Sequence, residues 1–306
     1  MDQLFIIGSG FDIDHGLKAS YNDFHDYLKI TYPNAEYESV NVTSYTIDNH
    51  GEFIVEKEEV VGYLVNVILR TVGQNWKDFE NALGELDFEN DFDNLPECLD
   101  RDGDENLWHD AYNNENLATD LTICVPKIKE LFAEWVETIE ITGCEPNRKF
   151  LNILEGANNY FLSFNYTMTL EDVYGIDKVC HVHGKQGGKI VVGHGIDSLI
   201  EENDIMNVGR ESGLNQIRLA LRKNTDKALD LHHKFFVNLP SEISSIYSYG
   251  FSFGAVDMVY IKELFRYVDT TNSTWYLNNF NKDDHSLHRK CIRKCGFKGR
   301  FSSFDS

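Results

Sequence analysis

The sequence lacks an uninterrupted apolar run of about 18 residues, the length that a membrane-spanning helix needs. It has only five prolines among 306 residues and no proline- or serine-rich linker, so the composition indicates no boundary between independent domains. A basic stretch ahead of an apolar one is also missing at the N-terminus, where the apolar run Leu4–Ile7 comes almost at once. We therefore expect no signal or transit peptide and a soluble, cytoplasmic protein without membrane contact.

Basic residues are scarce, with 28 lysines and arginines against 50 aspartates and glutamates, which gives a formal net charge of -22. Such a surface repels phosphate backbones and argues against broad nucleic-acid binding. It leaves room for a small anionic ligand, because backbone amides can hold phosphates against an unfavourable net field. The six cysteines are scattered along the chain, which is typical of reduced thiols rather than a disulfide framework.

Short apolar runs, several of them bounded by glycine, predict the strands of a buried, mainly parallel sheet. We expect strands at Leu4–Ile7, Tyr160–Phe164, Lys178–Val182, Ile190–Val192, Ile243–Tyr249 and Thr274–Leu277. Apolar residues at helical spacing fill the region between the first two strands. The sequence thus predicts an α/β protein with a Rossmann-like sheet, a single domain over residues 1–306, and a helical insertion at approximately residues 55–141.

A glycine-containing turn directly follows the first predicted strand. Glycines at this place let the backbone approach phosphates, which the amides of the following helix attract. Ile13 stands where a full dinucleotide fingerprint has its third glycine, so a tight structural turn is the alternative. We expect the amides of this turn to cradle a pyrophosphate, and its candidate cofactor-binding residues are Gly8, Ser9, Gly10, Phe11 and Asp12.

Asn165 follows the second predicted strand, in Leu162-Ser163-Phe164-Asn165-Tyr166-Thr167. Ligands of open parallel sheets bind beyond the carboxyl ends of the strands. An amide there can donate to and accept from a ribose or a water molecule. The alternative is a cap for a helix at Thr169–Tyr174.

Two histidines at the end of the third predicted strand, His181 and His183, share a face because side chains alternate along a strand. His183 precedes Gly184 and is well placed as a general base. His194 follows nearby, so a metal site made of the three histidines is an alternative, although no carboxylate has convincing spacing. We therefore expect no metal.

Another strand and turn lie near the C-terminus, in Tyr249-Gly250-Phe251-Ser252-Phe253-Gly254 followed by Asp257. A helix is expected at about Met258–Tyr267. This turn can hold the second half of a dinucleotide, which makes Gly250, Ser252 and Asp257 further candidate cofactor-binding residues, together with Gly184.

In this order the motifs resemble the AbiH family of bacterial abortive-infection proteins. The resemblance is carried by Gly10-Phe11-Asp12, His15-Gly16-Leu17, Ser20-Tyr21-Asn22-Asp23-Phe24, Trp76-Lys77-Asp78-Phe79-Glu80, Phe164-Asn165-Tyr166-Thr167, His183-Gly184 and Gly250-Phe251-Ser252 with Asp257. More distantly, the layout is similar to the sirtuin-like fold for adenine dinucleotides. That similarity implies that Asn165 and His183 form the catalytic pair of an NAD-cleaving enzyme.

The resemblance implies an anti-phage protein that binds NAD and hydrolyses its nicotinamide–ribose bond. A non-catalytic module that senses a nucleotide and acts through a partner defence protein is the alternative, as is a metal-dependent hydrolase using His181, His183 and His194. A phage trigger and assembly into a homo-oligomer are further expectations.

Overall fold

The computed structural model describes residues 2–37, 45–96, 98–104, 106–198 and 208–306. The chain divides into two compact units, each formed by segments that are distant in the sequence. A sheet unit consists of Met1–Ser20, Val136–Val191 and Asn224–Ser306. A helical unit consists of Tyr21–Trp135 and Val192–Lys223.

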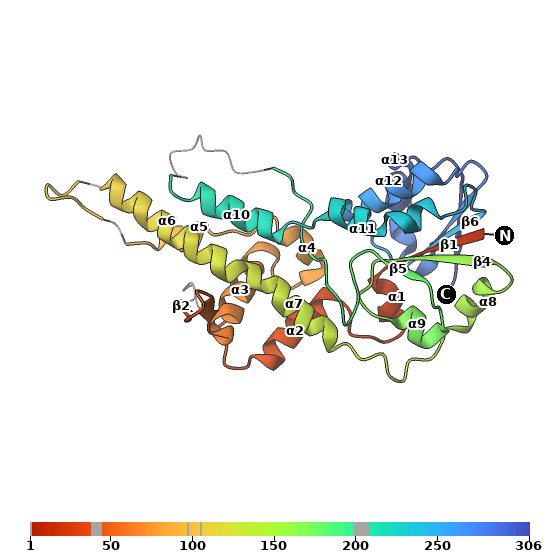
Figure 1. Ribbon diagram of the computed structural model, residues 1–306, viewed down its shortest axis with the longest axis horizontal. Coiled ribbons are helices and arrows are strands. Elements are labelled where there is room, and N and C mark those ends of the chain that lie inside the picture. The colour runs from red at the N-terminus through yellow and green to blue at the C-terminus, as the bar shows by residue number, and fades with distance from the viewer. Residues whose placement is uncertain (1, 38–44, 97, 105, 199–207) are drawn as a thin grey trace. The chain divides into compact units, whose positions relative to one another are not determined.

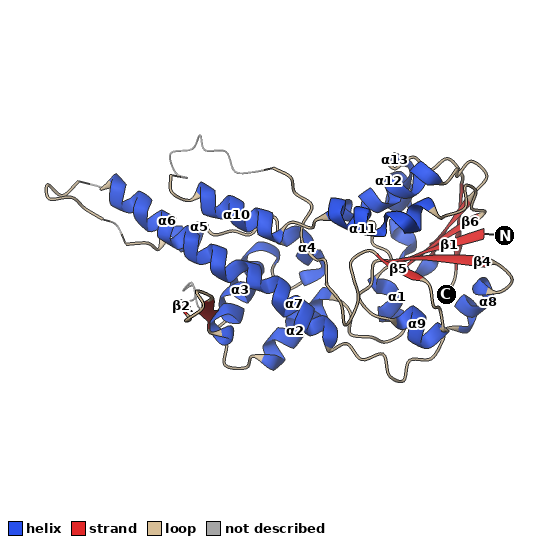
Figure 2. Cartoon of the chain, in the orientation of Figure 1, coloured by secondary structure: helices blue, strands red, loops and turns tan. Residues whose placement is uncertain are grey.

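The sheet unit is built on a six-stranded sheet in which every neighbouring pair of strands is parallel (Figures 1 and 2). In spatial order the strands are β5 (Val179–His181), β4 (Asn158–Ser163), β1 (Asp2–Ile7), β6 (Ser245–Tyr249), β7 (Thr274–Asn278) and β8 (Arg300–Phe304). The predicted α/β class with a mainly parallel sheet is therefore confirmed.

The order of the strands points to the functional edge. Numbered by their appearance within this sheet, the strands run 3-2-1-4-5-6, which is the order of doubly wound sheets that bind dinucleotides. In such sheets ligands bind beyond the carboxyl ends of the strands, where the direction of winding reverses. Here that reversal lies at β1, which pairs with β4 on one side and β6 on the other.

Helices cover both faces of the sheet, as its apolar strands require (Figure 2). Leu4 and Ile6 of β1 face a core shared with α11 (Thr225–Val237), α12 (Met258–Tyr267) and α13 (His285–Lys294). Phe5 and Ile7 face the opposite core, shared with α1 (Ser9–Asp14), α8 (Arg148–Leu154) and α9 (Thr169–Tyr174). The helices predicted at Thr169–Tyr174 and Met258–Tyr267 are both present.

Two strand assignments differ from the sequence-based expectation. Ile190–Val192 is not a strand, because after β5 the chain turns and Val191 donates its amide to the His183 carbonyl in a loop. The sixth strand, β8, was not predicted. Its sequence, Arg-Phe-Ser-Ser-Phe, has no continuous apolar run, and at the sheet edge it pairs only with β7.

The helical unit contains most of the helices between β1 and β4. They are α2 (Tyr21–Thr31), α3 (Lys57–Val72), η1 (Trp76–Asp78), α4 (Phe79–Ala82), α5 (Glu89–Asp93), α6 (Leu107–Cys124), η2 (Val125–Lys127) and α7 (Ile128–Glu137). The second segment of the unit, which follows β5, adds α10 (Glu211–Leu221). A small antiparallel hairpin, β2 (Tyr45–Ile47) with β3 (Phe53–Val55), accompanies them. Among the described residues no helix is long and apolar enough to cross a membrane.

A buried ion pair joins the two segments of the helical unit. The ammonium of Lys223, whose side chain is fully buried, lies 2.8 Å from Oε1 of Glu80 at α4. An isolated β-bridge between His194 and Arg222 brings the start and the end of the segment 192–223 together next to this ion pair. The residues that lead into and out of the segment 192–223 are thus tied to α4.

Candidate functional site

Asn165 lies just beyond β4, at the carboxyl edge of the sheet. Its backbone is fixed on both sides, since its amide donates to Ser163 Oγ and its carbonyl accepts from Nδ1 of His181 at 3.0 Å. The side chain is only 4% exposed, yet neither its amide nitrogen nor its oxygen has a hydrogen-bond partner within the described chain. Buried polar atoms are nearly always paired, so this amide is a candidate for contact with a ligand.

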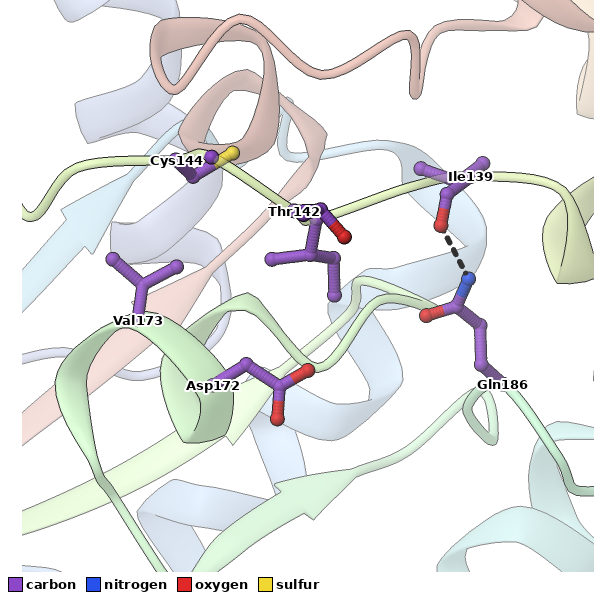
Figure 3. Close-up of a pocket in the computed structure, with 8 residues that line it drawn as sticks. Ile139, Thr142, Cys144, Asp172, Val173 and Gln186 are labelled. Carbon is purple, nitrogen blue, oxygen red and sulfur yellow. Dashed lines mark hydrogen bonds between the residues drawn. The ribbon is translucent and has the colours of Figure 1, made fainter.

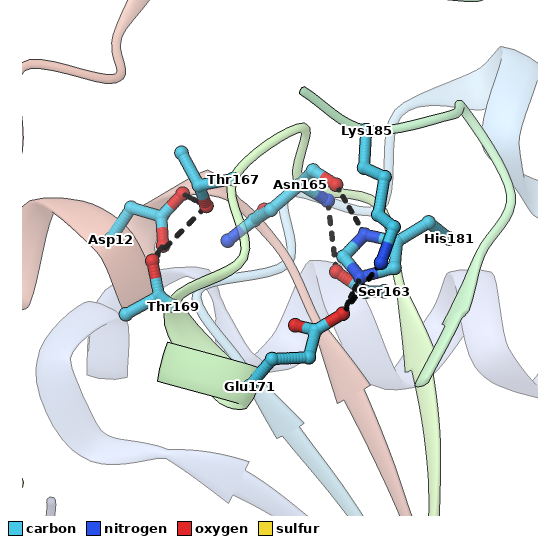
Figure 4. A network of polar contacts seen from close by, with 8 residues as sticks. All are labelled: Asp12, Ser163, Asn165, Thr167, Thr169, Glu171, His181 and Lys185. Atoms are coloured by element: carbon cyan, nitrogen blue, oxygen red, sulfur yellow. Dashed lines mark hydrogen bonds and ion pairs between the residues drawn. The ribbon is translucent and has the colours of Figure 1, made fainter. Parts of the chain in front are cut away.

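Asp12 is held beside Asn165 as a buried carboxylate (Figure 4). It is 1% exposed and accepts hydrogen bonds from Thr167 Oγ1 at 2.6 Å and Thr169 Oγ1 at 2.8 Å. Burial raises the pKa of Asp12 above its ordinary value, while the two hydroxyls and the neighbouring Asn165 amide offset part of this increase. The site thus contains an acid that is fixed in orientation and shielded from water.

His181, at the end of β5, is the centre of a second set of polar contacts (Figure 4). Its Nδ1 lies 3.0 Å from the Asn165 backbone carbonyl oxygen and its Nε2 lies 2.9 Å from Glu171 Oε1. Burial alone would raise the pKa of Glu171, but the contacts with His181 and Lys185 lower it below its ordinary value. Both ring nitrogens of His181 are thus engaged by neighbouring groups, so neither is free to contact a ligand.

His183 is placed differently from His181. Its Nε2 is 3.1 Å from Oδ1 of Asp257, but the approach does not have hydrogen-bond geometry. Asp257 ends the short helix η4 (Ala255–Asp257) that follows β6. The structure therefore pairs two of the predicted residues, His183 and Asp257, as a carboxylate and an imidazole.

The two residues of the predicted catalytic pair, Asn165 and His183, have different neighbours. The His183 ring contacts the rings of Phe164, at 5.2 Å between centroids, and Tyr260 of α12, at 5.7 Å. Phe164 belongs to the core on the α11–α13 face. Asn165, the next residue, lies beside Asp12 of α1.

The glycines near Gly10 and Gly250 have a structural role that corrects the expected phosphate cradle. The amides of Gly8 and Gly10 donate to the carbonyls of Tyr249 and Gly250, both at 3.0 Å, so they are not available to a pyrophosphate. A Cβ on Gly10 would lie 2.7 Å from the Gly250 Cα. The two turns after β1 and β6 therefore need glycine because their backbones touch each other.

The remaining predicted binding residues divide between core and surface. Phe11 is fully buried and packs edge-to-face on Tyr249 in the core, so it cannot reach a ligand. Ser9 and Ser252 are exposed. Gly184 has a φ of +79° and a Cβ there would meet the Lys189 carbonyl, so glycine is required by the turn itself.

The alternative of a metal bound by three histidines is not supported by their contacts. His194 belongs to the helical unit, where its Nε2 donates to the Arg218 carbonyl and its Nδ1 accepts from the Ile196 amide. Both ring nitrogens are thus occupied. Among the residues that the structure describes, no cluster of three or more histidine, cysteine or acidic side chains has metal-binding geometry.

A cavity of about 420 Å³ lies in the sheet unit, between the loop that follows α7 and helix α9 (Figure 3). Cys144 lines it and donates its thiol to the carbonyl of His15, three residues after Asp12. Burial, together with the negative charge of Asp12, raises the pKa of this thiol. The cavity therefore lies on the Asp12 side of the sheet.

Four polar residues of the site were not singled out from the sequence. Thr167, Thr169, Glu171 and Lys185 complete the contacts of Asp12 and His181. The only signal was their position, two to six residues after Asn165 or directly after Gly184, and single polar residues in a loop or in the first turn of a helix carry no distinctive pattern.

Comparison with known proteins gives one match. The family model described as bacteriophage abortive infection AbiH matches residues 4–279, which is most of the chain and includes every candidate site residue. No curated protein and no solved structure matches the chain.

Proposed function

The chain belongs to the AbiH family and serves in bacteriophage abortive infection, and we propose that it does so by hydrolysing the nicotinamide–ribose bond of NAD. The substrate would lie at the carboxyl edge of the sheet, over β1, β4 and β6. Loss of NAD from an infected cell would stop its metabolism and phage replication with it.

The observation that carries this proposal is the unpartnered amide of Asn165. A buried amide without a hydrogen bond costs about 1–3 kcal/mol of stability. It therefore favours a ligand that supplies the missing partners, and ribose hydroxyls both donate and accept. The 3-2-1-4-5-6 order of the strands supports a dinucleotide as the molecule that carries this ribose.

In the proposed reaction the bond between the ribose C1′ and the pyridinium nitrogen breaks, and its electrons stay on the nitrogen. Nicotinamide leaves as a neutral molecule and the ribose becomes an oxocarbenium ion. Water adds to C1′ and loses one proton, which gives ADP-ribose. Asn165 holds the ribose, and His183, oriented by Asp257, takes the proton from the water.

The test is release of nicotinamide from NAD by the purified protein. A positioned general base contributes typically ~10²–10⁴-fold to a rate, so His183→Ala is expected to slow release by about that factor. His233→Ala is the matched control, because His233 is exposed on α11. Equal release by wild type and His183→Ala would overturn the role of His183.

The same experiment separates catalysis from sensing. If the wild-type protein binds NAD in calorimetry but releases no nicotinamide, hydrolysis is rejected. The chain would then act as a nucleotide-sensing module that works through a partner protein.

A further inference from the structure

The Asp12 carboxylate has acceptor capacity that the chain does not use. Thr167 and Thr169 each donate one hydrogen bond, one to each carboxylate oxygen. A carboxylate oxygen has two lone-pair sites, so each retains one. The two threonines thus fix the carboxylate in one orientation without saturating it.

The Asn165 amide next to it supplies the complementary groups. It has two N–H donors and a carbonyl acceptor, and the side chain is nine-tenths buried. Neither its nitrogen nor its oxygen makes a hydrogen bond of ordinary geometry within the described chain, although the amide lies close enough to Asp12 to lower the pKa of that carboxyl. His181 and Ser163 fix the backbone carbonyl and the backbone amide of Asn165, so the side chain extends from an anchored main chain. Two rigid groups, one accepting and one mainly donating, therefore stand side by side (Figure 4).

The chemistry of this pair selects its ligand. A phosphate or carboxylate would be repelled by Asp12, which bears no ion pair with a lysine or arginine in the described chain. A neutral sugar hydroxyl can donate to the carboxylate and accept from the amide at the same time. Two adjacent hydroxyls can form hydrogen bonds with both the carboxylate and the amide.

We propose that Asp12 and Asn165 form a binding site for the cis-diol of a ribose, in which Asp12 accepts a hydrogen bond from the 2-hydroxyl and Asn165 donates a hydrogen bond to the oxygen of the same hydroxyl. This inference rests on the proposed function for the identity of the sugar, which is the ribose that carries nicotinamide. It makes Asp12 a residue that determines specificity for ribose over 2-deoxyribose.

Calorimetric titration with ADP-ribose and with its analogue that lacks the 2-hydroxyl of the terminal ribose tests the site. The two probes carry the same charge, so the acidic surface affects both equally. A hydrogen bond to a charged group is expected to make ADP-ribose bind about ten- to a hundredfold more tightly than the deoxy analogue. Asp12→Asn is expected to bring the two affinities to within about threefold of each other.

Two further variants control for folding. Asp14→Asn changes the other acidic residue of α1, whose carboxylate accepts from the Tyr249 hydroxyl, and should keep the preference. Asn165→Leu removes the amide without leaving an unpaired polar group and should lose the preference even if Asp12→Asn fails to fold.

Each outcome is decisive. Equal affinity of the wild type for both probes, no binding of either, or a preference that survives Asn165→Leu overturns the diol site. A preference without nicotinamide release keeps the site and rejects hydrolysis. Nicotinamide release without a preference rejects the diol site and keeps the proposed function.

Discussion

Thr167 donates a hydrogen bond of 2.6 Å to Asp12, a residue 155 positions earlier in the chain. The contact joins the end of β4 to the helix that follows β1, because the parallel pairing of the two strands brings their carboxyl ends together. It is the shortest link in the set of contacts around the buried carboxylate. Its consequences can be measured through stability, binding and pH.

Replacement of Asp12 by Asn should change how stability depends on pH. Because burial raises the folded-state pKa of Asp12 above its ordinary value of 3.8, the unfolded chain releases this proton at a lower pH than the folded chain. The wild type therefore loses stability, relative to Asp12→Asn, as pH rises from the ordinary value to the folded-state value, and no further above it. Urea unfolding of both proteins across this range measures the difference.

Thr167→Val provides the control for this titration. Without the hydroxyl the charged carboxylate has one donor fewer, so the folded-state pKa rises further and the loss of stability extends to higher pH. A stability difference between wild type and Asp12→Asn that does not vary with pH would contradict the assignment.

Replacement of Asn165 by Leu should not destabilise the protein. The amide has no partner, and a buried unpaired amide costs about 1–3 kcal/mol, so the free energy of unfolding should stay level or rise by up to that amount. Asn159→Leu on β4 is the control, because its amide donates to the Leu154 carbonyl at 2.8 Å and its loss should cost about 1 kcal/mol. Equal destabilisation by both would indicate a structural role for Asn165.

Lys223→Met should strongly destabilise the helical unit. The substitution leaves the largely buried Glu80 carboxylate without its cation, which should lower the free energy of unfolding by about 3–5 kcal/mol. The double variant with Glu80→Gln should recover part of this loss. Lys57→Met removes a pair with Glu134 in which both side chains are exposed, and should cost at most about 1 kcal/mol. Denaturant unfolding that ranks the two lysines equally would contradict this account.

Gly10→Val should lower the thermal stability of the sheet unit. Its Cβ would lie 2.7 Å from the backbone of Gly250, which cannot move aside as a flexible side chain can, and overpacking of this kind typically costs about 1–3 kcal/mol. Ser9→Val, at the exposed neighbouring position, should leave Tm nearly unchanged. A Gly10→Val protein with wild-type Tm would show that the two turns do not pack as described.

The local pattern of the sequence was sufficient for much of the sheet. Apolar runs such as Leu4–Ile7 and Thr274–Leu277 become strands because they can be buried on both faces of a parallel sheet. The position of Asn165 after such a run was also enough to place it at the carboxyl edge. Edge strand β8 lacked this pattern, and Ile190–Val192 had the pattern without becoming a strand.

Only the tertiary structure decided which residues of the site act together. A glycine motif has the same sequence whether its amides face a phosphate or another loop, and here the partner of Gly10 is Gly250, 240 residues away. His181 and His183 share a face in an ideal strand, but the chain turns after His181, so one contacts Glu171 and the other Asp257. Local periodicity describes the burial of each segment, whereas hydrogen bonds between distant segments depend on how the strands are ordered in the sheet.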